Sequence, residues 1–446
     1  MRVHLQTLGC RLNEAELESW SRQLQALGHR LVTSPGQADL LVVNTCAVTE
    51  EAVRKSRKLL RRSQRENPGA KLVVSGCYAS LEPQSVVDLG VDLLVPNRDK
   101  ERLVEIAIHE LDQATLPLNI HTLDAGEIPA RRRRRAFLKV QDGCRYQCAF
   151  CVVTQARGEE RSPPPSEVVA EVNRLHGTGV QEVVLSGVHI GGYGSDCGSD
   201  LVGLLEALLA DTTMPRIRIG SLEPWDLPHR LWDLFADPRL QPHLHLPVQS
   251  GSDRVLRRMA RRGKRAEYAS LVAEARRRVT NLNLTTDIIV GFPGEEEADW
   301  HATLDLVAGL GFGQVHIFPF SARRGTRAAA LPDQVNPTVR RQRCSELQAL
   351  ATRLRCDALA RQVGRRCPVL VESRCRGEDS VGHWFGYTPN FLPVHICAPM
   401  DAVLQNCILE VTLSGVTADG ESLLAEAGHV LQIDPALLPT RFATEE

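Results

Sequence analysis

Three cysteines follow one another closely in the middle of the chain, at Cys144, Cys148 and Cys151. Their spacing, CxxxCxxC, lets three thiolates on a turn-like peptide reach adjacent corners of one iron–sulfur cube. A fourth cysteine is absent from the motif, although a structural zinc site or a simple electron-carrying cluster is normally closed by four protein ligands. The spacing therefore predicts a cluster with one iron open to a substrate or cofactor. The alternatives are a zinc knuckle or three buried thiols.

Three further cysteines, Cys10, Cys46 and Cys77, each come directly after a predicted strand. The carboxyl ends of parallel strands lie along one edge of a sheet, where folds of this kind place their ligands. We therefore expect the three thiols to meet, although they are far apart in the sequence. The alternative is three unrelated buried cysteines, which is a common situation for this residue.

The elements that position this second trio alternate between strands and helices. The apolar patterns predict strands over 3–8, 39–44 and 71–75 and helices over 13–27 and 50–65. Such alternation is typical of a doubly wound α/β domain, which we place at residues 1–118. A linker at 119–135 follows, because the five adjacent arginines at 131–135 repel one another and resist burial. The arginines are interpreted either as a phosphate-backbone contact or as a solvated hinge.

The first trio belongs to a second α/β pattern, over residues 136–362. The predicted strands of this region are 137–140, 182–186, 216–220, 243–246, 284–290 and 314–318. Six strands with intervening helices predict a parallel barrel or partial barrel, whose active site lies at the carboxyl ends of the strands. Several candidate residues fall at these ends: Cys144, Ser186, Gly187, Glu223, Gln249 and Gly291.

The last region, residues 363–435, has short strands at 368–372, 382–387 and 408–413 with turn residues between them. This pattern predicts a small all-β barrel. Barrels of this kind often stack single-stranded bases on aromatic residues that lie beside basic ones. Trp384, Tyr387 and Phe391 lie near Arg374 and Arg376 in the sequence. These aromatics are interpreted either as such a stacking surface or as the core of the domain.

The amino-acid composition limits the class of protein to which the chain can belong. The chain has 446 residues, 43% hydrophobic and 24% charged, which is ordinary for a globular protein of two to four domains. A net charge of -1 gives no global reason to expect a polyanion partner. Thirteen cysteines, an odd number, are too sparse for a small disulfide scaffold. Because the sequence shows no leader and no apolar run of membrane-spanning length, we expect a cytoplasmic protein whose grouped cysteines bind metal.

With these motifs together, the whole chain resembles the methylthiotransferase family of radical S-adenosylmethionine (SAM) enzymes. It is most similar to the MtaB-like branch, which methylthiolates N6-threonylcarbamoyladenosine at position 37 of tRNA. The matching stretches are 7–13 (TLGCRLN), 43–49 (VNTCAVT), 136–144 (AFLKVQDGC), 156–158 (ARG), 222–224 (LEP), 242–251 (PHLHLPVQSG) and 286–295 (TDIIVGFPGE). The chain departs from its relatives at Thr154-Gln155, where proline is usual, and at Ser80, where glutamine is common.

The resemblance implies two [4Fe–4S] clusters. Cys144, Cys148 and Cys151 would hold the catalytic one, whose open iron binds SAM and splits it into methionine and a 5′-deoxyadenosyl radical. Cys10, Cys46 and Cys77 would hold a second cluster that carries the sulfur to be transferred, and a second SAM would supply the methyl group. The resemblance also implies a SAM pocket lined by Phe150, Ser186, Gly187, Glu223, Gln249, Ile289 and Gly291.

The implied partners are tRNA, bound in part by a terminal TRAM-type barrel, and a flavodoxin or ferredoxin as electron donor. We expect a monomer without membrane contact. The nearest alternative is the same chemistry on isopentenyladenosine in tRNA or on an aspartate of a ribosomal protein. An alternative of another class is a non-catalytic RNA-binding protein with structural metal sites.

Overall fold

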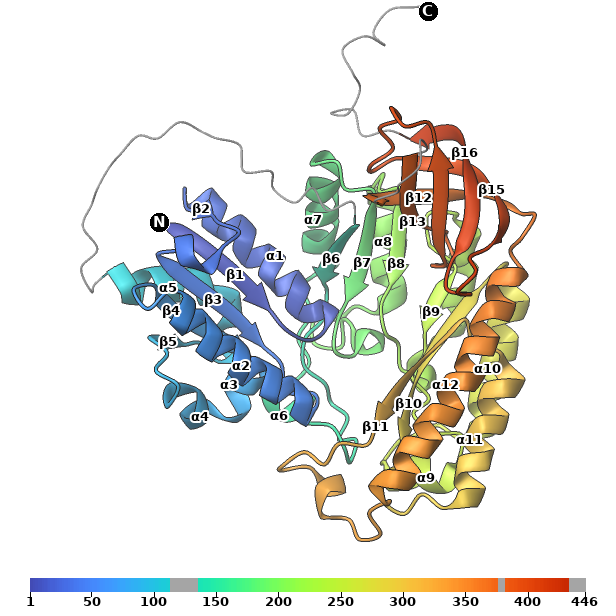
Figure 1. The fold of residues 1–446 in the computed structure, drawn as a ribbon, viewed down its shortest axis with the longest axis horizontal. Helices are drawn as coiled ribbons and strands as arrows, with labels where there is room; N and C mark the ends of the chain where they lie inside the picture. Colours follow the sequence, from blue (N-terminus) through green and yellow to red (C-terminus); the bar gives the residue numbers. More distant parts are fainter. Residues whose placement is uncertain (113–134, 376–381, 433–446) are drawn as a thin grey trace, which may run out of the picture.

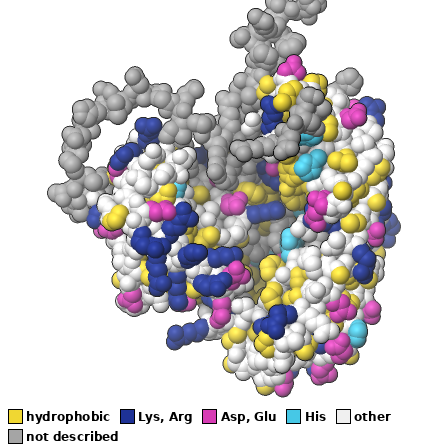
Figure 2. Space-filling model, in the orientation of Figure 1, with side chains coloured by type: hydrophobic (Ala, Val, Ile, Leu, Met, Phe, Trp, Pro, Cys, Tyr) yellow, Lys and Arg dark blue, Asp and Glu magenta, His cyan; other side chains and the backbone are white. Residues whose placement is uncertain are grey.

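The computed structural model describes residues 1–112, 135–375 and 382–432, which form three parts around a central hollow (Figures 1 and 2). The N-terminal part is a five-stranded parallel sheet in the order β2-β1-β3-β4-β5. Its strands are β1 (Arg2–Thr7), β2 (Arg30–Leu31), β3 (Leu40–Thr45), β4 (Lys71–Gly76) and β5 (Leu93–Leu94). Its helices are α1 (Arg11–Ala26), α2 (Glu50–Glu66), α3 (Cys77–Leu81), α4 (Pro83–Val87) and α5 (Leu103–Asp112).

Helices cover both faces of this sheet, as the doubly wound pattern predicts. One apolar cluster joins α1 and α5 to one face, and another joins α2, α3 and α4 to the other. The central strand β3 is buried along its whole length, which is why its sequence reads as an almost continuous apolar run. The strand order reverses between β1 and β3, and the crevice at such a switch point is where folds of this type bind ligands. Cys10 follows β1 and Cys46 follows β3.

The middle part is a partial barrel of six parallel strands, as predicted. Two three-stranded sheets, β6-β7-β8 and β11-β10-β9, are joined by isolated parallel bridges such as Ser221 to His245. The strands are β6 (Arg135–Lys139), β7 (Glu182–Ser186), β8 (Arg216–Ile219), β9 (His243–His245), β10 (Asn283–Val290) and β11 (Gln314–Pro319). The helices are α6 (Val153–Arg157), α7 (Pro165–Gly177), α8 (Leu201–Asp211), α9 (Asp253–Arg258), α10 (Arg265–Arg278), α11 (Glu297–Leu310) and α12 (Pro337–Ala360). None of the described helices has the length and apolar character that a bilayer crossing requires.

The C-terminal part is a closed five-stranded barrel in the order β12-β13-β14-β16-β15, which confirms the predicted small all-β fold. Its strands are β12 (Arg366–Cys375), β13 (Gly382–Tyr387), β14 (Pro393–Ala398), β15 (Ile408–Val416) and β16 (Leu423–Gln432). Trp384 is 4% exposed and belongs to the core of this barrel. Tyr387 and Phe391 stack on each other, with ring centroids 4.7 Å apart, and Arg135 lies over both rings. The core interpretation therefore holds for Trp384, while Arg376 lies outside the described residues.

A buried ionic cluster joins the two barrels. The Glu182 carboxylate forms ion pairs of 2.8 to 3.0 Å with three guanidinium groups, those of Arg135, Arg216 and Arg218. Arg216 and Arg218 in turn donate hydrogen bonds to backbone carbonyls of the C-terminal barrel, at residues 387–389. The sequence places Arg135 in a linker, either as a phosphate-backbone contact or in a solvated hinge. It instead begins β6 with its side chain 10% exposed, because Glu182 and the Glu372 carboxylate, 2.7 Å away, compensate its charge.

This cluster predicts an acid-sensitive stability. Burial alone would raise the pKa of Glu182, but Arg218, Arg135 and Arg216 outweigh it and hold that pKa far below its usual value. A depressed carboxylate pKa contributes stability above the unfolded-state value of about 4.3, and the contribution is lost as the pH falls below it, by about 1.4 kcal/mol per pH unit. Unfolding free energies of wild type and Glu182→Gln should therefore converge between pH 5 and pH 3, and a constant difference would contradict this.

Candidate active site

The loop that carries the first cysteine trio follows β6 and is folded back by a short antiparallel pairing. Asp142 and Arg161 exchange two backbone hydrogen bonds of 2.9 Å. Gly143 adopts a φ of +74°, and a Cβ atom there would lie 1.8 Å from the carbonyl oxygen of Glu159. Only glycine fits this close approach, which turns the chain so that Cys144 enters the loop.

The three thiols of this loop lie within electrostatic range of one another. Burial and, to a smaller extent, the neighbouring Cys151 and Cys148 together raise the pKa of Cys144 to about 12. The Cys151 thiol behaves in the same way, with burial raising its pKa to about 11. Backbone N–H groups of Tyr146 and Val153 point at the Cys144 and Cys151 sulfurs, each at 3.4 Å. Three crowded thiolates need a compensating cation, so this donor set fits an iron–sulfur cluster.

The second trio also comes together, as its placement after three strands predicts. Burial raises the pKa of Cys46, and Cys77 and Cys10 are close enough to contribute to its value of about 11. The sulfur of Cys46 lies 2.8 Å from where a Cβ atom on Gly9 would stand, so the glycine before Cys10 allows the two segments to approach. All thirteen cysteines are free thiols. This donor set fits a second cluster for the same reason as the first.

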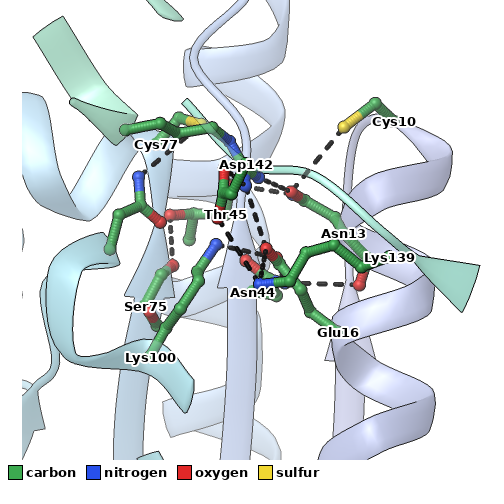
Figure 3. A network of polar contacts seen from close by, with 12 residues as sticks. Cys10, Asn13, Glu16, Asn44, Thr45, Ser75, Cys77, Lys100, Lys139 and Asp142 are labelled. Atoms are coloured by element: carbon green, nitrogen blue, oxygen red, sulfur yellow. Dashed lines mark hydrogen bonds and ion pairs between the residues drawn. The ribbon is translucent and has the colours of Figure 1, made fainter. Parts of the chain in front are cut away.

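Two asparagines, Asn13 and Asn97, link these sulfurs to the surrounding structure, and Figure 3 shows Asn13 beside Cys10. The Cys10 thiol lies 3.8 Å from the Asn13 side-chain oxygen, and the Asn97 amide donates to the Cys77 sulfur at 3.8 Å. Asn97 also donates to the carbonyl of Ala156 at 2.7 Å. The N-terminal domain therefore contacts α6 of the barrel at the position of its thiols.

Arg157, the last residue of α6, is buried between the two parts. Its guanidinium donates to Asn13 at 2.8 Å and to the carboxylates of Glu16 and Asp142 at 2.9 Å each. The positive charge also lowers the pKa values of Cys10 and Cys46, against the larger effect of burial. Arg157 therefore contacts Asn13, whose side chain lies beside Cys10 of the second trio. Through Asp142 it also contacts the beginning of the loop that carries the first trio.

Glu16 is the centre of this network. Its carboxylate is 2.7 Å from the Lys100 ammonium, 2.9 Å from Arg157 and 3.7 Å from Lys139. Burial would raise the pKa of Glu16, but these cations outweigh it and hold the pKa far below the usual value. Figure 3 shows Asn13 and Asp142 between Cys10 and Cys77, with Glu16 and Lys100 on the side away from the sulfurs. We refer to Asn13, Glu16, Lys100, Lys139, Asp142 and Arg157 as the interdomain network.

Helix α6 runs from the loop of the first trio to the interdomain network beside the second trio. This helix starts at Val153, two residues after Cys151, and ends at Arg157. Five helical residues span about 7.5 Å at 1.5 Å per residue. The Thr154 hydroxyl donates to the carbonyl of Tyr146 at 2.9 Å and so attaches the helix to the loop.

A second buried polar group supports the other side of the loop. The His189 ring bonds to Glu160 through Nδ1 at 2.6 Å and to Asp226 through Nε2 at 2.7 Å. Burial lowers the pKa of His189, but the two carboxylates outweigh it and raise the pKa above its usual value. Tyr146 donates its hydroxyl to Asp226 at 2.8 Å. The carboxylates of Glu160 and Asp226 bond to both ring nitrogens, so His189 holds these two side chains beside the loop.

The predicted SAM-pocket residues fall into two groups. Phe150 packs against an apolar cluster that contains Ile289, together with Ala149, Met259, Phe292 and Phe320. Glu223 forms an ion pair of 2.8 Å with the buried Arg261, whose guanidinium also lies 4.0 Å from the Cys148 sulfur. Phe150, Ile289 and Glu223 are thus placed at the loop that carries the first trio.

The other four pocket residues are defined chiefly by backbone geometry. Gly291 has a φ of +73°, and Gln249, although not glycine, has a φ of 71° and is held by backbone bonds to Asp287 and Ile289. The hydroxyl of Ser186 donates to the carbonyl of Val184 at 3.2 Å. A side chain at Gly187 would meet Gln141 at 3.0 Å. All four lie at or after the carboxyl ends of barrel strands, as predicted. The hydroxyl of Ser186, however, forms its hydrogen bond within its own strand.

Several residues of the site were not predicted from the sequence. Asn13 and Arg157 stand inside stretches that match the family, at TLGCRLN and ARG, and those motifs were the available signal. Glu16, Lys100 and Arg261 have no such signal, because charged residues normally face solvent. Their burial depends on partners that are distant in the sequence.

Comparisons with known proteins agree with this architecture. Residues 2–95 match the uncharacterized protein family UPF0004, and residues 138–307 match the radical SAM superfamily. A Bacillus subtilis protein named threonylcarbamoyladenosine tRNA methylthiotransferase MtaB is 33% identical, over 88% of this chain and 89% of its own. A Chloroflexus aurantiacus protein named tRNA-2-methylthio-N(6)-dimethylallyladenosine synthase is 34% identical, over 96% of this chain and 93% of its own.

Among solved structures, the radical SAM methyltransferase TsrM from Kitasatospora setae, with cobalamin and a [4Fe-4S] cluster bound, has a TM-score of 0.54. The likeness covers 71% of this chain and 74% of that one at 17% identity, and it shows the fold alone. The sequence relatives extend over almost the whole length of both chains, and the three-cysteine loop lies within the residues that match the radical SAM superfamily. The chain therefore belongs to the methylthiotransferase family of radical SAM enzymes.

Proposed function

We propose that this enzyme converts N6-threonylcarbamoyladenosine at position 37 of tRNA to its 2-methylthio derivative. The observation that carries the proposal is the pairing of two three-cysteine sites across one interdomain network, a short helix apart. Relatives from Bacillus subtilis and Chlamydia pneumoniae, 33% and 34% identical, are named for this substrate. Residues 1–118 would form the methylthiotransferase domain, 119–135 a linker, 136–362 the radical SAM domain and 363–435 a TRAM-type domain.

In this proposal, Cys144, Cys148 and Cys151 hold the [4Fe–4S] cluster to which SAM binds, and Cys10, Cys46 and Cys77 hold a second. Bound there, the clusters and SAM supply a primary radical and a transferable sulfur, which no side chain can supply. The pocket for SAM would be formed by Phe150, Ser186, Gly187, Glu223, Gln249, Ile289 and Gly291. A flavodoxin or ferredoxin would donate electrons to the protein, which we expect to act as a monomer in the cytoplasm.

The chain's own residues position these groups. Amide N–H groups of Tyr146 and Val153 stabilise the Cys144 and Cys151 thiolates, because they point at the sulfur atoms. Arg261 orients Glu223 toward the loop, and its charge favours the thiolate form of Cys148 against the larger effect of burial.

Arg11 supports the choice of substrate. It follows Cys10 directly, is exposed, and lies 5.6 Å from the ring centre of Phe137 and 5.5 Å from that of Phe391, where the three parts of the molecule meet. Within the described part of the chain, no carboxylate forms an ion pair with it. The threonylcarbamoyl group carries a carboxylate that a guanidinium binds well, whereas an isopentenyl group is apolar.

Replacing Arg11 by glutamine tests this assignment. We expect kcat/KM for tRNA bearing threonylcarbamoyladenosine to fall about 10- to 100-fold, the loss of one charged hydrogen bond. SAM cleavage without tRNA should be unchanged, and Arg11→Lys should retain part of the activity. An unaltered kcat/KM in Arg11→Gln would remove the residue from substrate recognition.

The second candidate substrate is isopentenyladenosine in tRNA, because the Chloroflexus aurantiacus relative, 34% identical, is named for that modification. Nucleoside mass spectrometry of tRNA from cells with and without the protein distinguishes the two. We expect the methylthio derivative of threonylcarbamoyladenosine to disappear with the protein. If it persists while methylthiolated isopentenyladenosine is lost, the second candidate replaces the first.

A further inference from the structure

A wide groove of about 1470 Å³ lies along the outer face of α2, on the N-terminal part of the molecule. Its cations come from α2 and from the segment after β11, and we call it the α2 groove. They include Arg54, Lys58, Arg61, Arg65, Arg323 and Arg324. Figure 2 shows Lys and Arg side chains gathered on this lobe, beside the central hollow. This local charge contrasts with the net charge of -1 of the whole chain.

The helical spacing explains why α2 presents a basic face. Its buried positions, Val53, Ser56, Leu60 and Ser63, face the sheet, so the cations three and four residues apart form a row on the opposite side. From Arg54 to Arg65 this row extends about 17 Å at 1.5 Å per residue. Phosphates of a nucleic acid strand repeat every 3.4 Å along a duplex axis, so the row is long enough to meet several of them.

Most of this charge has no protein partner. Lys55 and Arg62, on α2 but outside the groove, pair with Glu51 and Glu66 at 2.9 and 2.6 Å. By contrast, Lys58, Arg61 and Arg65 have no ion pair with any described residue. The groove also contains the carboxylates of Glu50, Glu51 and Glu82, and Glu82 pairs with Arg57 at 2.9 Å. The cations outnumber these carboxylates, so the cations without a partner repel one another, and a polyanion would relieve this repulsion.

Arg323 is an independent indication of an anion. Its side chain lines the groove although the residue is only 8% exposed, and its Nε atom has no hydrogen-bond partner among the described residues. A buried guanidinium without a carboxylate is costly unless a ligand compensates it. The preceding Ser321 accepts a hydrogen bond from the Glu50 amide at 3.3 Å, so the segment is attached to the start of α2.

The same segment connects the groove to the three-cysteine loop. Gln155, on α6, donates to the carbonyl of Gly325 at 3.0 Å, and Arg327 donates to the carbonyl of Gln147 at 2.6 Å. Because Gln147 lies between Cys144 and Cys148, a strand bound in the α2 groove would pass beside the loop that the reaction uses.

We propose that the α2 groove binds the sugar–phosphate backbone of the nucleic acid substrate, whose nature rests on the proposed function. The binding surface would then lie on the N-terminal domain and the segment 321–327, in addition to any contact by the C-terminal barrel. Phosphate contacts carry no base information, so this groove would set the position of the tRNA rather than the identity of the modified base.

The test is a binding titration of unmodified tRNA transcript with the anaerobically reconstituted full chain at several KCl concentrations. At 0.15 M salt each phosphate contact contributes about fivefold, so Arg61→Glu/Arg65→Glu should weaken binding about 30-fold and lower the slope of log affinity against log salt by about two. Lys55→Glu/Arg62→Glu is the matched control, since it makes the same charge change on the same helix outside the groove. It should weaken binding less than threefold.

Arg323→Gln provides a second variant and should lower the affinity about fivefold. Unchanged binding by Arg61→Glu/Arg65→Glu, or an equal loss in the control, would overturn the proposal. Reduced protein should still release 5′-deoxyadenosine from SAM in every variant, which shows that the cluster sites are intact. Because the transcript lacks any modified base, this result is separate from the choice of substrate: tRNA binding through the groove can hold even if threonylcarbamoyladenosine is not methylthiolated.

Discussion

Replacing Cys10, Cys46 and Cys77 together by alanine is expected to abolish methylthiolation while leaving SAM cleavage intact. Each [4Fe–4S] cluster contributes four irons, so reconstituted protein should fall from about eight to about four irons per chain. The physical reason is that the two trios occupy different domains, each with its own apolar core. The measurements are iron analysis, 5′-deoxyadenosine release and methylthiolated product from the same preparation.

The reciprocal variant completes this prediction. With Cys144, Cys148 and Cys151 replaced by alanine, 5′-deoxyadenosine release should stop and about four irons should remain, bound by the other trio. Cys197→Ala is the matched control, because that cysteine is exposed and distant from both motifs in the sequence. Eight irons in the variant that lacks Cys10, Cys46 and Cys77 would show that these thiols are not ligands.

Arg157→Met is expected to destabilise the protein by about 3 to 5 kcal/mol, the cost of removing one partner from a buried ion pair. The change leaves Glu16 and Asp142 without the guanidinium that lies 2.9 Å from each. Lys100 and Lys139 still compensate part of the negative charge, and Lys139 still reaches Glu16 across the domains at 3.7 Å, so the network loses one interdomain cation rather than all of them. Guanidinium chloride unfolding under anaerobic conditions measures the loss.

Arg157→Lys separates charge from geometry. Lysine keeps the positive charge but cannot make the three hydrogen bonds to Asn13, Glu16 and Asp142 together, so it should recover part of the stability. The Arg102→Met variant, at an exposed ion pair, should leave the free energy of unfolding nearly unchanged. A loss below about 1 kcal/mol in Arg157→Met would contradict the role given to the interdomain network.

Much of the architecture could be predicted from local sequence. Strands such as β3 and β7 are largely apolar runs of strand length. The cysteines that follow β1, β3 and β4 indicated a shared sheet edge before any contact was known. The CxxxCxxC spacing that begins at Cys144 predicted an iron–sulfur site, because the three ligands are close neighbours in the sequence.

Contacts between distant segments could not be predicted in this way. Glu16 and Lys100 are 84 residues apart, and Glu16 and Arg157 are 141 apart, so nothing local distinguishes them from surface charges. Arg135 stands in a run of arginines that favours solvent, yet Glu182 and Glu372 compensate it in the interior. In each case burial depends on a partner that only the folded chain supplies.

The most direct measurement offers the reconstituted enzyme, with SAM and a reductant, an equimolar mixture of two tRNAs. One carries threonylcarbamoyladenosine at position 37 and the other isopentenyladenosine, and nucleoside mass spectrometry follows both. We predict a methylthio group on threonylcarbamoyladenosine alone, together with release of 5′-deoxyadenosine. Methylthiolation of isopentenyladenosine alone, or of neither nucleoside by protein that holds eight irons, would contradict the proposed function.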